Sequence, residues 1–291
     1  MLIIFGLDLQ WQSTYIVLHN YVMDNFIHLC QPDQSKSCGA CCGLYNYAVS
    51  SKASLAERLR NRTALFQKMV SAPEDLPAFS EAVSSGEDGT KRYEVIYCCE
   101  YTGFLDAQER RVGCLLHPLR NGGLDMREVS FYGKDLCDGH FCPSYHHISR
   151  KEKTALIEII DDWYLWGLCI TDIDLVVIWF RLVSEALGEM PPPERFGLKP
   201  LRSIARAFFS FKTEWPFRSE AVNRFGKYYF DGSQYMINFI DYEALGAKRS
   251  PFDRIFLSLC SEFKNREGLR RGEVMIAENI EAFRRAYRAM F

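Results

Sequence analysis

Hydrophobic residues near the end of the chain recur at helical spacing. Ile276, Ile280, Phe283, Tyr287 and Met290 follow one another at intervals of 4, 3, 4 and 3 residues. This spacing places all five on one face of a helix, while arginines occupy the other faces. We therefore expect a terminal helix whose apolar stripe packs against a core.

Capping signals precede further apolar segments in the same half of the chain. Ser149–Glu152 is a capping box, and Thr171–Asp174 starts another helix, which should end before the prolines at 191–193. Ser250–Asp253 places a capping hydroxyl, a proline and an acid in the order of a helix start. The long apolar segment Trp163–Leu182 contains two aspartates, so we expect a buried helix pair there and no transmembrane segment.

The first half of the chain has a mixed pattern. A capping box at Ser54–Glu57 should open a helix that runs to about Val70, and a short helix is expected at Pro77–Val83. Tyr93–Phe104 and Arg110–Leu116 are rich in Val, Ile, Tyr and Cys, which is typical of strands, and we expect them to pair as a hairpin. Residues 117–149 look irregular.

These patterns predict an α+β fold that is predominantly helical. An irregular, cysteine-rich region with a short hairpin (residues 1–149) should pack on a helical region (residues 150–291), in one unit or two. Net charge is −2, and no basic run suggests a nucleic-acid partner. The N-terminal segment lacks the basic start of a signal peptide, so we expect a cytoplasmic protein; Met23 is an alternative start to Met1.

Cysteines are concentrated in the first half. The chain has 11 cysteines, of which only Cys169 and Cys260 follow residue 150. Thiols stay reduced in the cytosol, where clustered cysteines most often bind a metal or act catalytically. Cys30, Cys169 and Cys260 have apolar neighbours and are expected to be small buried residues.

The densest group is Cys38-Gly39-Ala40-Cys41-Cys42-Gly43. Two thiolates at positions i and i+3 can bind one ion from a tight turn, and glycines allow the backbone to wrap around it. Cys42 is directed elsewhere and could ligate after rearrangement. In the adjacent pair Cys98-Cys99 the side chains should face opposite ways, so that at most one faces the site.

Further donors occur later in the first half. Cys114 lies in a Cys-Leu-Leu-His-Pro segment, and Cys137 and Cys142 flank a short polar stretch. We predict one transition-metal centre built from Cys38, Cys41, Cys42, Cys114, Cys137 and Cys142. Whether nearby histidines also bind the metal stays open for His117, His140, His146 and His147.

At these cysteines the chain resembles the CxxCxxCC family of zinc- or iron-chelating proteins, and more distantly the flagellin lysine N-methylases. Cys38, Cys41 and Cys42 match the last three of the opening four cysteines, Cys114 a later one, and Cys137 and Cys142 the closing pair. Ser35 stands at the first position, so either this position is not an essential ligand or Cys30 or a histidine substitutes for it. Residues 119–136 form a long insert.

The resemblance covers roughly residues 35–145 and implies zinc or iron, including a [4Fe–4S] cluster, as the cofactor. Methyl transfer is not implied, because the sequence has no nucleotide-binding loop. Two alternatives remain open: a thiol–disulfide redox protein using Cys38 and Cys41, and a metal-dependent enzyme of methyl-transfer or redox type with a pocket in the helical half. The partner is an unidentified protein or small molecule.

Overall fold

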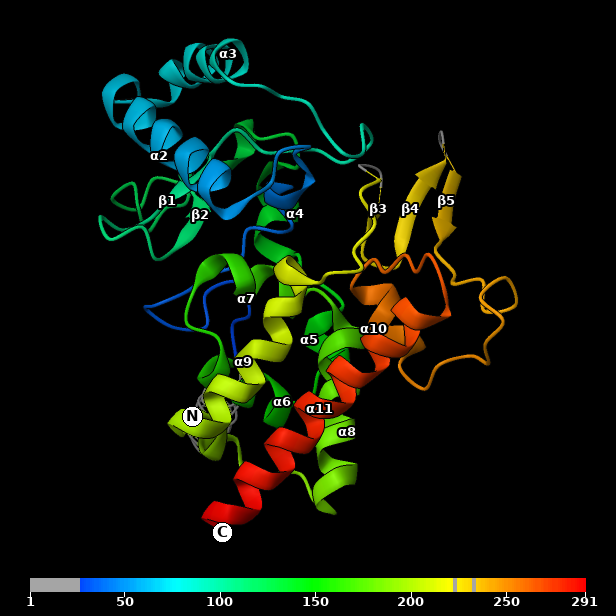
Figure 1. Cartoon of the computed structure of the whole chain (residues 1–291). Helices are drawn as coiled ribbons and strands as arrows, with labels where there is room; N and C mark the ends of the chain where they lie inside the picture. The colour runs from blue at the N-terminus through cyan, green and yellow to red at the C-terminus, as the bar shows by residue number, and fades with distance from the viewer. Residues whose placement is uncertain (1–26, 222–223, 232–233) are drawn as a thin grey trace, which may run out of the picture.

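A computed structural model describes residues 27–221, 224–231 and 234–291 (Figure 1). The fold is predominantly helical with two small antiparallel sheets, which confirms the expected α+β class. Met1, Met23 and His19 lie outside the described residues.

The second half of the chain is a bundle of helices. In the lower part of Figure 1, α8, α9 and α11 run side by side, and α6 and α7 pack near α9. Among the described residues, no helix is long and apolar enough to cross a membrane. The helices of this half are α6 (Arg150–Ile159), α7 (Trp163–Ile170), α8 (Ile173–Leu187), η4 (Pro193–Gly197), α9 (Lys199–Glu214), α10 (Asp253–Ser258) and α11 (Arg266–Met290).

Local capping explains where these helices begin. The predicted box at Ser149 is formed, with Ser149 and Glu152 each accepting from the backbone N–H of the other. Asp162 accepts from two backbone N–H groups and starts α7, so α6 and α7 are separate helices. Asp172 caps α8 and separates it from α7, which confirms the predicted helix pair. Ser250 does not cap a helix directly: Phe252 is the N-cap of α10, and Ser250 accepts from its N–H.

Aromatic side chains fill the core of this bundle, which we call the helical core. Trp179 on α8 lies at its centre, stacked on Phe208 at 5.6 Å and edge-on to Phe283 at 5.5 Å between ring centroids. The apolar stripe of α11 faces this core as expected, except that Met290 near its end is 41% exposed.

A small sheet in this half was not predicted from the sequence. Its strands β3 (Arg224–Phe225), β4 (Tyr228–Asp231) and β5 (Gln234–Ile237) pair antiparallel in chain order. Gly226 has a φ of 66° in the two-residue turn between β3 and β4, a conformation that favours glycine.

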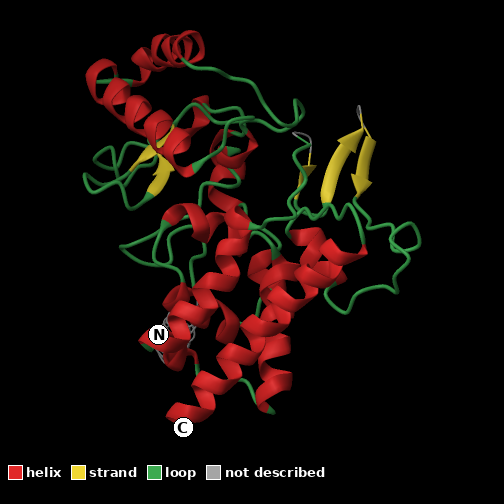
Figure 2. Cartoon of the chain, viewed as in Figure 1, coloured by secondary structure: helices red, strands yellow, loops and turns green. Residues whose placement is uncertain are grey.

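Apart from helices α2 and α3, the first half contains short elements joined by long loops (Figure 2). The predicted hairpin is present but short, because only β1 (Thr102–Phe104) and β2 (Val112–Cys114) pair, with Thr102 opposite Cys114. The expected helix begins before Ser54, because Ser51 is the residue that caps it. The helices of this half are η1 (Leu44–Asn46), α2 (Lys52–Met69), η2 (Pro73–Asp75), α3 (Leu76–Gly86), η3 (Arg127–Val129), α4 (Gly133–Gly139) and α5 (Ser144–His147).

The chain from Leu29 to Ser50 connects the two halves. Trp166 Nε1 donates to the carbonyl of buried Leu29 at 3.0 Å, and the Tyr45 hydroxyl donates to the carbonyl of Trp163 at 3.2 Å. Gly167 permits this approach, because a Cβ there would lie 2.0 Å from the Tyr45 hydroxyl oxygen. The halves also share a hydrophobic cluster, which we call the joining cluster: Leu44, Tyr45, Tyr47, Leu55, Leu59, Phe104, Val112, Trp163 and Leu168.

We expect Phe283→Ala to lower the free energy of unfolding by about 3–5 kcal/mol, because it leaves a cavity beside Trp179. Urea denaturation of the full chain measures this change. Phe239→Ala is the matched control: Phe239 is 73% exposed, and its loss should cost within about 0.5 kcal/mol. Equal losses for the two variants would contradict the described core.

Candidate metal centre

The predicted cysteines lie on segments that meet beside the joining cluster. Cys38, Cys41 and Cys42 occupy a tight turn, closed by a hydrogen bond of 2.9 Å from Gly43 N to Ala40 O. Cys114 ends β2, Cys137 lies on α4, and Cys142 lies between α4 and α5. The turn is therefore positioned by the contacts that anchor Leu29 and Tyr45.

Residues 97–99 pack directly on the end of this turn. The N–H of Cys99 donates to the carbonyl of Cys42 at 2.9 Å. Gly43 has a φ of 74°, and a Cβ at this position would lie 2.0 Å from the Tyr97 carbonyl oxygen. Only glycine therefore allows the two chain segments to approach so closely.

The hairpin brings Cys114 to the same place. Burial and the neighbouring Cys114 thiol raise the pKa of Cys42 to about 12, against a smaller lowering by the Thr102 hydroxyl. Burial and the Cys42 thiol likewise raise the pKa of Cys99 to about 12. The Thr102 hydroxyl oxygen is buried, and within the described residues it has no hydrogen-bond partner of normal geometry.

Cys137 approaches this group from α4. Its thiol lies 3.6 Å from the hydroxyl of Ser130. Burial raises the pKa of Cys114 to about 12, and the thiols of Cys99 and Cys137 add to the rise. Cys137 itself is exposed, so this side of the group opens to solvent.

Cys38 lies against a different set of residues. Its N–H donates to the carbonyl of Cys30 at 2.8 Å. The Tyr145 hydroxyl donates to the Cys30 thiol at 3.8 Å, and the Tyr145 N–H donates to the carbonyl of Cys142 at 3.0 Å. Burial raises the pKa of Cys38 well above its ordinary value, and the thiols of Cys30, Cys41 and Cys142 raise it further.

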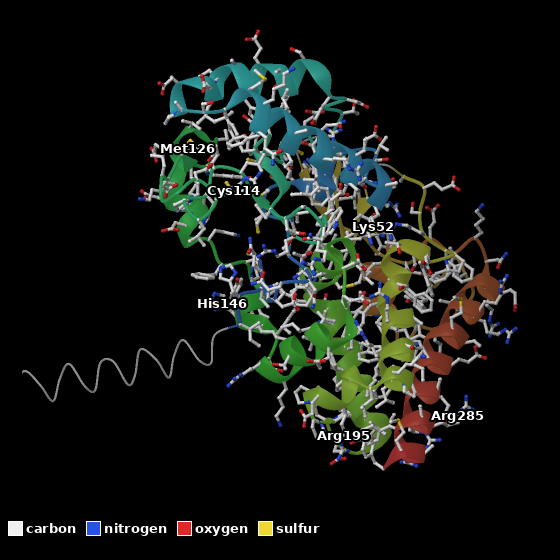
Figure 3. The ribbon with its side chains drawn as sticks, turned by 90° about the vertical axis from the view of Figure 1, so that its left-hand side faces the viewer. Lys52, Cys114, Met126, His146, Arg195 and Arg285 are labelled. Atoms are coloured by element: carbon white, nitrogen blue, oxygen red, sulfur yellow. The ribbon has the colours of Figure 1, made fainter. Side chains whose placement is uncertain are left out.

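The histidines are less closely associated with the thiols. His117 accepts a hydrogen bond from Leu119 N through Nδ1 at 3.2 Å. His140, His146 and His147 are exposed. Figure 3 labels Cys114 in the region under α2 and His146 near α5, apart from one another. The structure therefore brings the cysteines together more closely than the histidines.

Across residues 27–221, 224–231 and 234–291, no three Cys, His, Asp or Glu side chains are spaced as in a completed metal site. A cysteine sulfur can change position by rotation about its Cα–Cβ bond, with no backbone movement. A cysteine binds a metal as its thiolate, so each thiol must first release a proton. Raised pKa values make this release more costly for Cys38, Cys42 and Cys114.

Sequence reasoning gave both Cys30 and Cys99 only conditional places, Cys30 as a substitute at the position of Ser35 and Cys99 as one of an adjacent pair. The apolar neighbours of Cys30 suggested a buried residue, but its thiol lies beside Tyr145 and Cys142. For Cys99 the signal was the alternation of side chains: Cys98 faces Asn46 and the Gly43 carbonyl instead. Cys169 and Cys260 are buried in the second half, as expected.

A pocket of about 570 Å³ lies between the Ser50–Lys52 segment and helices α7 and α9. It is shared by the two halves, and its lining is mainly polar. Burial and the nearby charge of Arg218 lower the pKa of Arg92. Two acids, Asp162 and Glu214, also line the pocket. The cations of its lining are Lys52, Arg92, Arg206, Lys212 and Arg218.

Comparisons with protein-family models, with curated proteins and with solved structures found no match to this chain. The resemblance to the CxxCxxCC family therefore depends on the cysteine pattern alone.

We expect Gly43→Ala to destabilise the fold by more than the roughly 1–2 kcal/mol that a left-handed conformation costs a residue with a Cβ. The added methyl group also collides with the Tyr97 carbonyl, so residues 97–99 must move away from Cys42. Urea denaturation measures the loss of stability, and amide hydrogen exchange at Cys99 reports the separation.

Gly89→Ala is the control for this substitution, because a Cβ at Gly89 meets nothing within 4 Å. Its effect should stay within about 0.5 kcal/mol. Unchanged protection of the Cys99 amide in Gly43→Ala would show that the described contact between the two segments is wrong.

Proposed function

We propose that this protein binds a transition metal, zinc or iron, with a [4Fe–4S] cluster as one form, through clustered cysteine thiolates. The ligands come from Cys38, Cys41, Cys42, Cys114, Cys137 and Cys142. One observation carries the proposal: cysteine-bearing segments far apart in the sequence pack together, since the Cys99 N–H donates to the Cys42 carbonyl and both residues lie in one hydrophobic cluster with Cys114.

The donor chemistry fits these metals. Thiolate sulfur is a soft ligand that suits zinc and iron–sulfur clusters, whereas magnesium and calcium prefer oxygen. Structural zinc usually takes four ligands and a [4Fe–4S] cluster usually takes four thiolates. We leave histidine out of this ligand set, because His140, His146 and His147 are exposed and His117 Nδ1 accepts a hydrogen bond from Leu119 N.

The resemblance to the CxxCxxCC family supports the same ligands. At the position where the family has its first cysteine, the hydroxyl of Ser35 donates to Asp33 at 2.7 Å. Asp33 also accepts from the backbone N–H groups of Ser35 and Lys36. Ser35 is thus part of a local turn and is not needed as a ligand.

A thiol–disulfide redox role for Cys38 and Cys41 is the weaker alternative. Dithiol oxidoreductases lower the pKa of their first cysteine, usually at a helix N-terminus. Here burial raises the pKa of Cys38, and the first element after Cys41 is the single turn η1. Both features oppose formation of a reactive thiolate at neutral pH.

The activity that such a metal serves stays open. We place the protein in the cytoplasm, where thiols remain reduced, with a protein or small molecule as partner. The pocket beside α7 and α9 is the candidate substrate site for the alternative of a metal-dependent enzyme. Three cations of its lining, Lys52, Arg206 and Lys212, already pair with carboxylates.

We expect protein purified without oxygen to contain zinc, or iron with sulfide, in stoichiometric amounts. In native conditions a thiol reagent should then reach fewer thiols than after a chelator is added, because ligated sulfur does not react. Elemental analysis and thiol titration measure these quantities. Metal-free protein in which only an oxidation-sensitive pair of thiols changes would favour the redox alternative.

We also expect a chelator to lower hydrogen-exchange protection across residues 35–145 and to leave that of the helical core largely unchanged. Thiolate zinc sites contribute roughly 10–16 kcal/mol of apparent binding free energy, comparable to the roughly 5–15 kcal/mol of a whole domain. Exchange measured by mass spectrometry, with helix α11 as the internal control, checks this difference. Equal protection with and without chelator would contradict a metal that supports this region.

A further inference from the structure

We infer that the cysteines form two separate four-thiol metal sites in place of one shared centre. The first site is Cys30, Cys38, Cys41 and Cys142, and the second is Cys42, Cys99, Cys114 and Cys137. This inference rests on the proposed metal-binding function and adds to it the number of metal centres and a fourth ligand for each.

The division falls between the adjacent residues Cys41 and Cys42. Cys38 packs against the helical core, whereas Cys42 packs against a cluster under α2 and α3 that includes Phe66, Phe79 and Leu116. The turn thus presents its cysteines to two hydrophobic surroundings on different sides. This difference in surroundings supports assigning Cys38 and Cys42 to different sites.

The first group is held together by Tyr145 and by the loop before the turn. The hydrogen bond from Cys38 N to Cys30 O, 2.8 Å long, joins the start and end of that loop. The Tyr145 hydroxyl contacts the Cys30 thiol while its N–H binds the Cys142 carbonyl. Cys41 follows Cys38 by three residues in the turn that the hydrogen bond from Gly43 N to Ala40 O closes, and this spacing assigns Cys41 to the same group.

The second group is held together by the hairpin and by residues 97–99. The Cys99 N–H donates to the Cys42 carbonyl at 2.9 Å. The Cys99 carbonyl accepts from Thr102 N at 3.4 Å in the turn that leads into β1. Strand pairing sets Cys114 opposite Thr102, three residues after Cys99. Cys42, Cys99 and Cys114 all belong to or pack against the cluster under α2 and α3.

Cys137 closes the second group from α4. Its neighbour Asp138 pairs with the buried Arg127 on η3 at 2.9 Å, which fixes the end of α4 near the hairpin. Met126 N, just before η3, donates to the carbonyl of Leu116 at 3.2 Å. The Cys137 thiol lies 3.6 Å from the hydroxyl of Ser130 just after η3, so η3 links Cys137 to the chain that follows Cys114. Cys137 is therefore the solvent-facing member of the second group.

The count of ligands favours this division. The six cysteines predicted from the sequence separate into two sets of three, and each set lacks one ligand for zinc or for a [4Fe–4S] cluster. Cys30 and Cys99 supply the missing thiols. Bacterial ferredoxins use a related arrangement, because the fourth cysteine of one short run ligates the other cluster.

Cadmium NMR on the full-length protein tests the number of sites. Cadmium is the probe, because it replaces zinc at thiolate sites and its chemical shift reports the sulfur ligands. We expect about two equivalents of bound cadmium and two resonances, each in the range of four-thiolate coordination. One equivalent and one resonance would overturn the two-site inference but would leave the proposed metal-binding function intact.

Single substitutions then assign each resonance to a group. We expect Cys30→Ser to shift or remove one resonance and Cys99→Ser the other, while the second resonance persists and shows that the chain is still folded. Cys98→Ser is the matched control, because Cys98 neighbours Cys99 but bonds to Asn46 and Gly43, and it should keep both resonances.

The remaining outcomes decide between the two levels of the proposal. If both variants retain two unchanged resonances, Cys30 and Cys99 are not ligands and the inference fails. If each variant loses both resonances while its circular dichroism is unchanged, one shared centre exists and the inference fails. If the wild-type chain binds no cadmium, zinc or iron, the proposed function fails as well.

Discussion

The segment from Leu29 to Tyr45, buried at both ends, is the constraint on which the cysteine-rich half depends. Its ends are fixed by hydrogen bonds to α7, from Trp166 to the Leu29 carbonyl and from Tyr45 to the Trp163 carbonyl. Between these anchors the chain must turn, and the cysteines occupy that turn. The position of three thiols is thus set by tryptophan and tyrosine contacts to the helical half, and not by regular secondary structure.

Metal binding would compensate for the sparse hydrophobic packing of the first half. Residues 87–149 contain only short helices and one short hairpin, and several of their apolar side chains, such as Leu119 and Phe131, are exposed. Irregular backbone of this kind gains little from cooperative hydrogen bonding, so it needs cross-links. Thiolate–metal bonds join segments distant in the sequence and can supply them.

The helical half was predictable because its signals are local. The capping box at Ser149 and the aspartate at 172 specify helix starts within four residues, and the stripe on α11 identifies its buried face. The small sheet β3–β5 was missed because its strands are short and follow no apolar alternation that stands out. The start of α2 was misplaced because Ser51 and Ser54 offer equivalent hydroxyls, and only the fold decides between them.

The site was only partly predictable, because its grouping depends on distant contacts. Spacing identified the turn at Cys38–Cys42 but could not show which later cysteine lies beside which thiol. Backbone hydrogen bonds between Cys99 and Cys42 and between Cys38 and Cys30 bring these segments together. Cys30 had only a conditional place, because apolar neighbours in sequence do not reveal a polar contact such as that with Tyr145.

The close contact between Tyr45 and Gly167 couples the position of helix α7 to that of the cysteine turn. Tyr45 follows Cys42 by three residues. Its hydroxyl lies so close to the backbone of α7 that a Cβ at Gly167 would be 2.0 Å from the hydroxyl oxygen. Tyr164 of α7, whose carbonyl accepts from the Tyr45 hydroxyl at 3.3 Å, also lines the pocket beside α7 and α9. If a molecule in that pocket displaced α7, Tyr45 would have to move with the helix because the two are closely packed, and the turn that carries the thiols would move too.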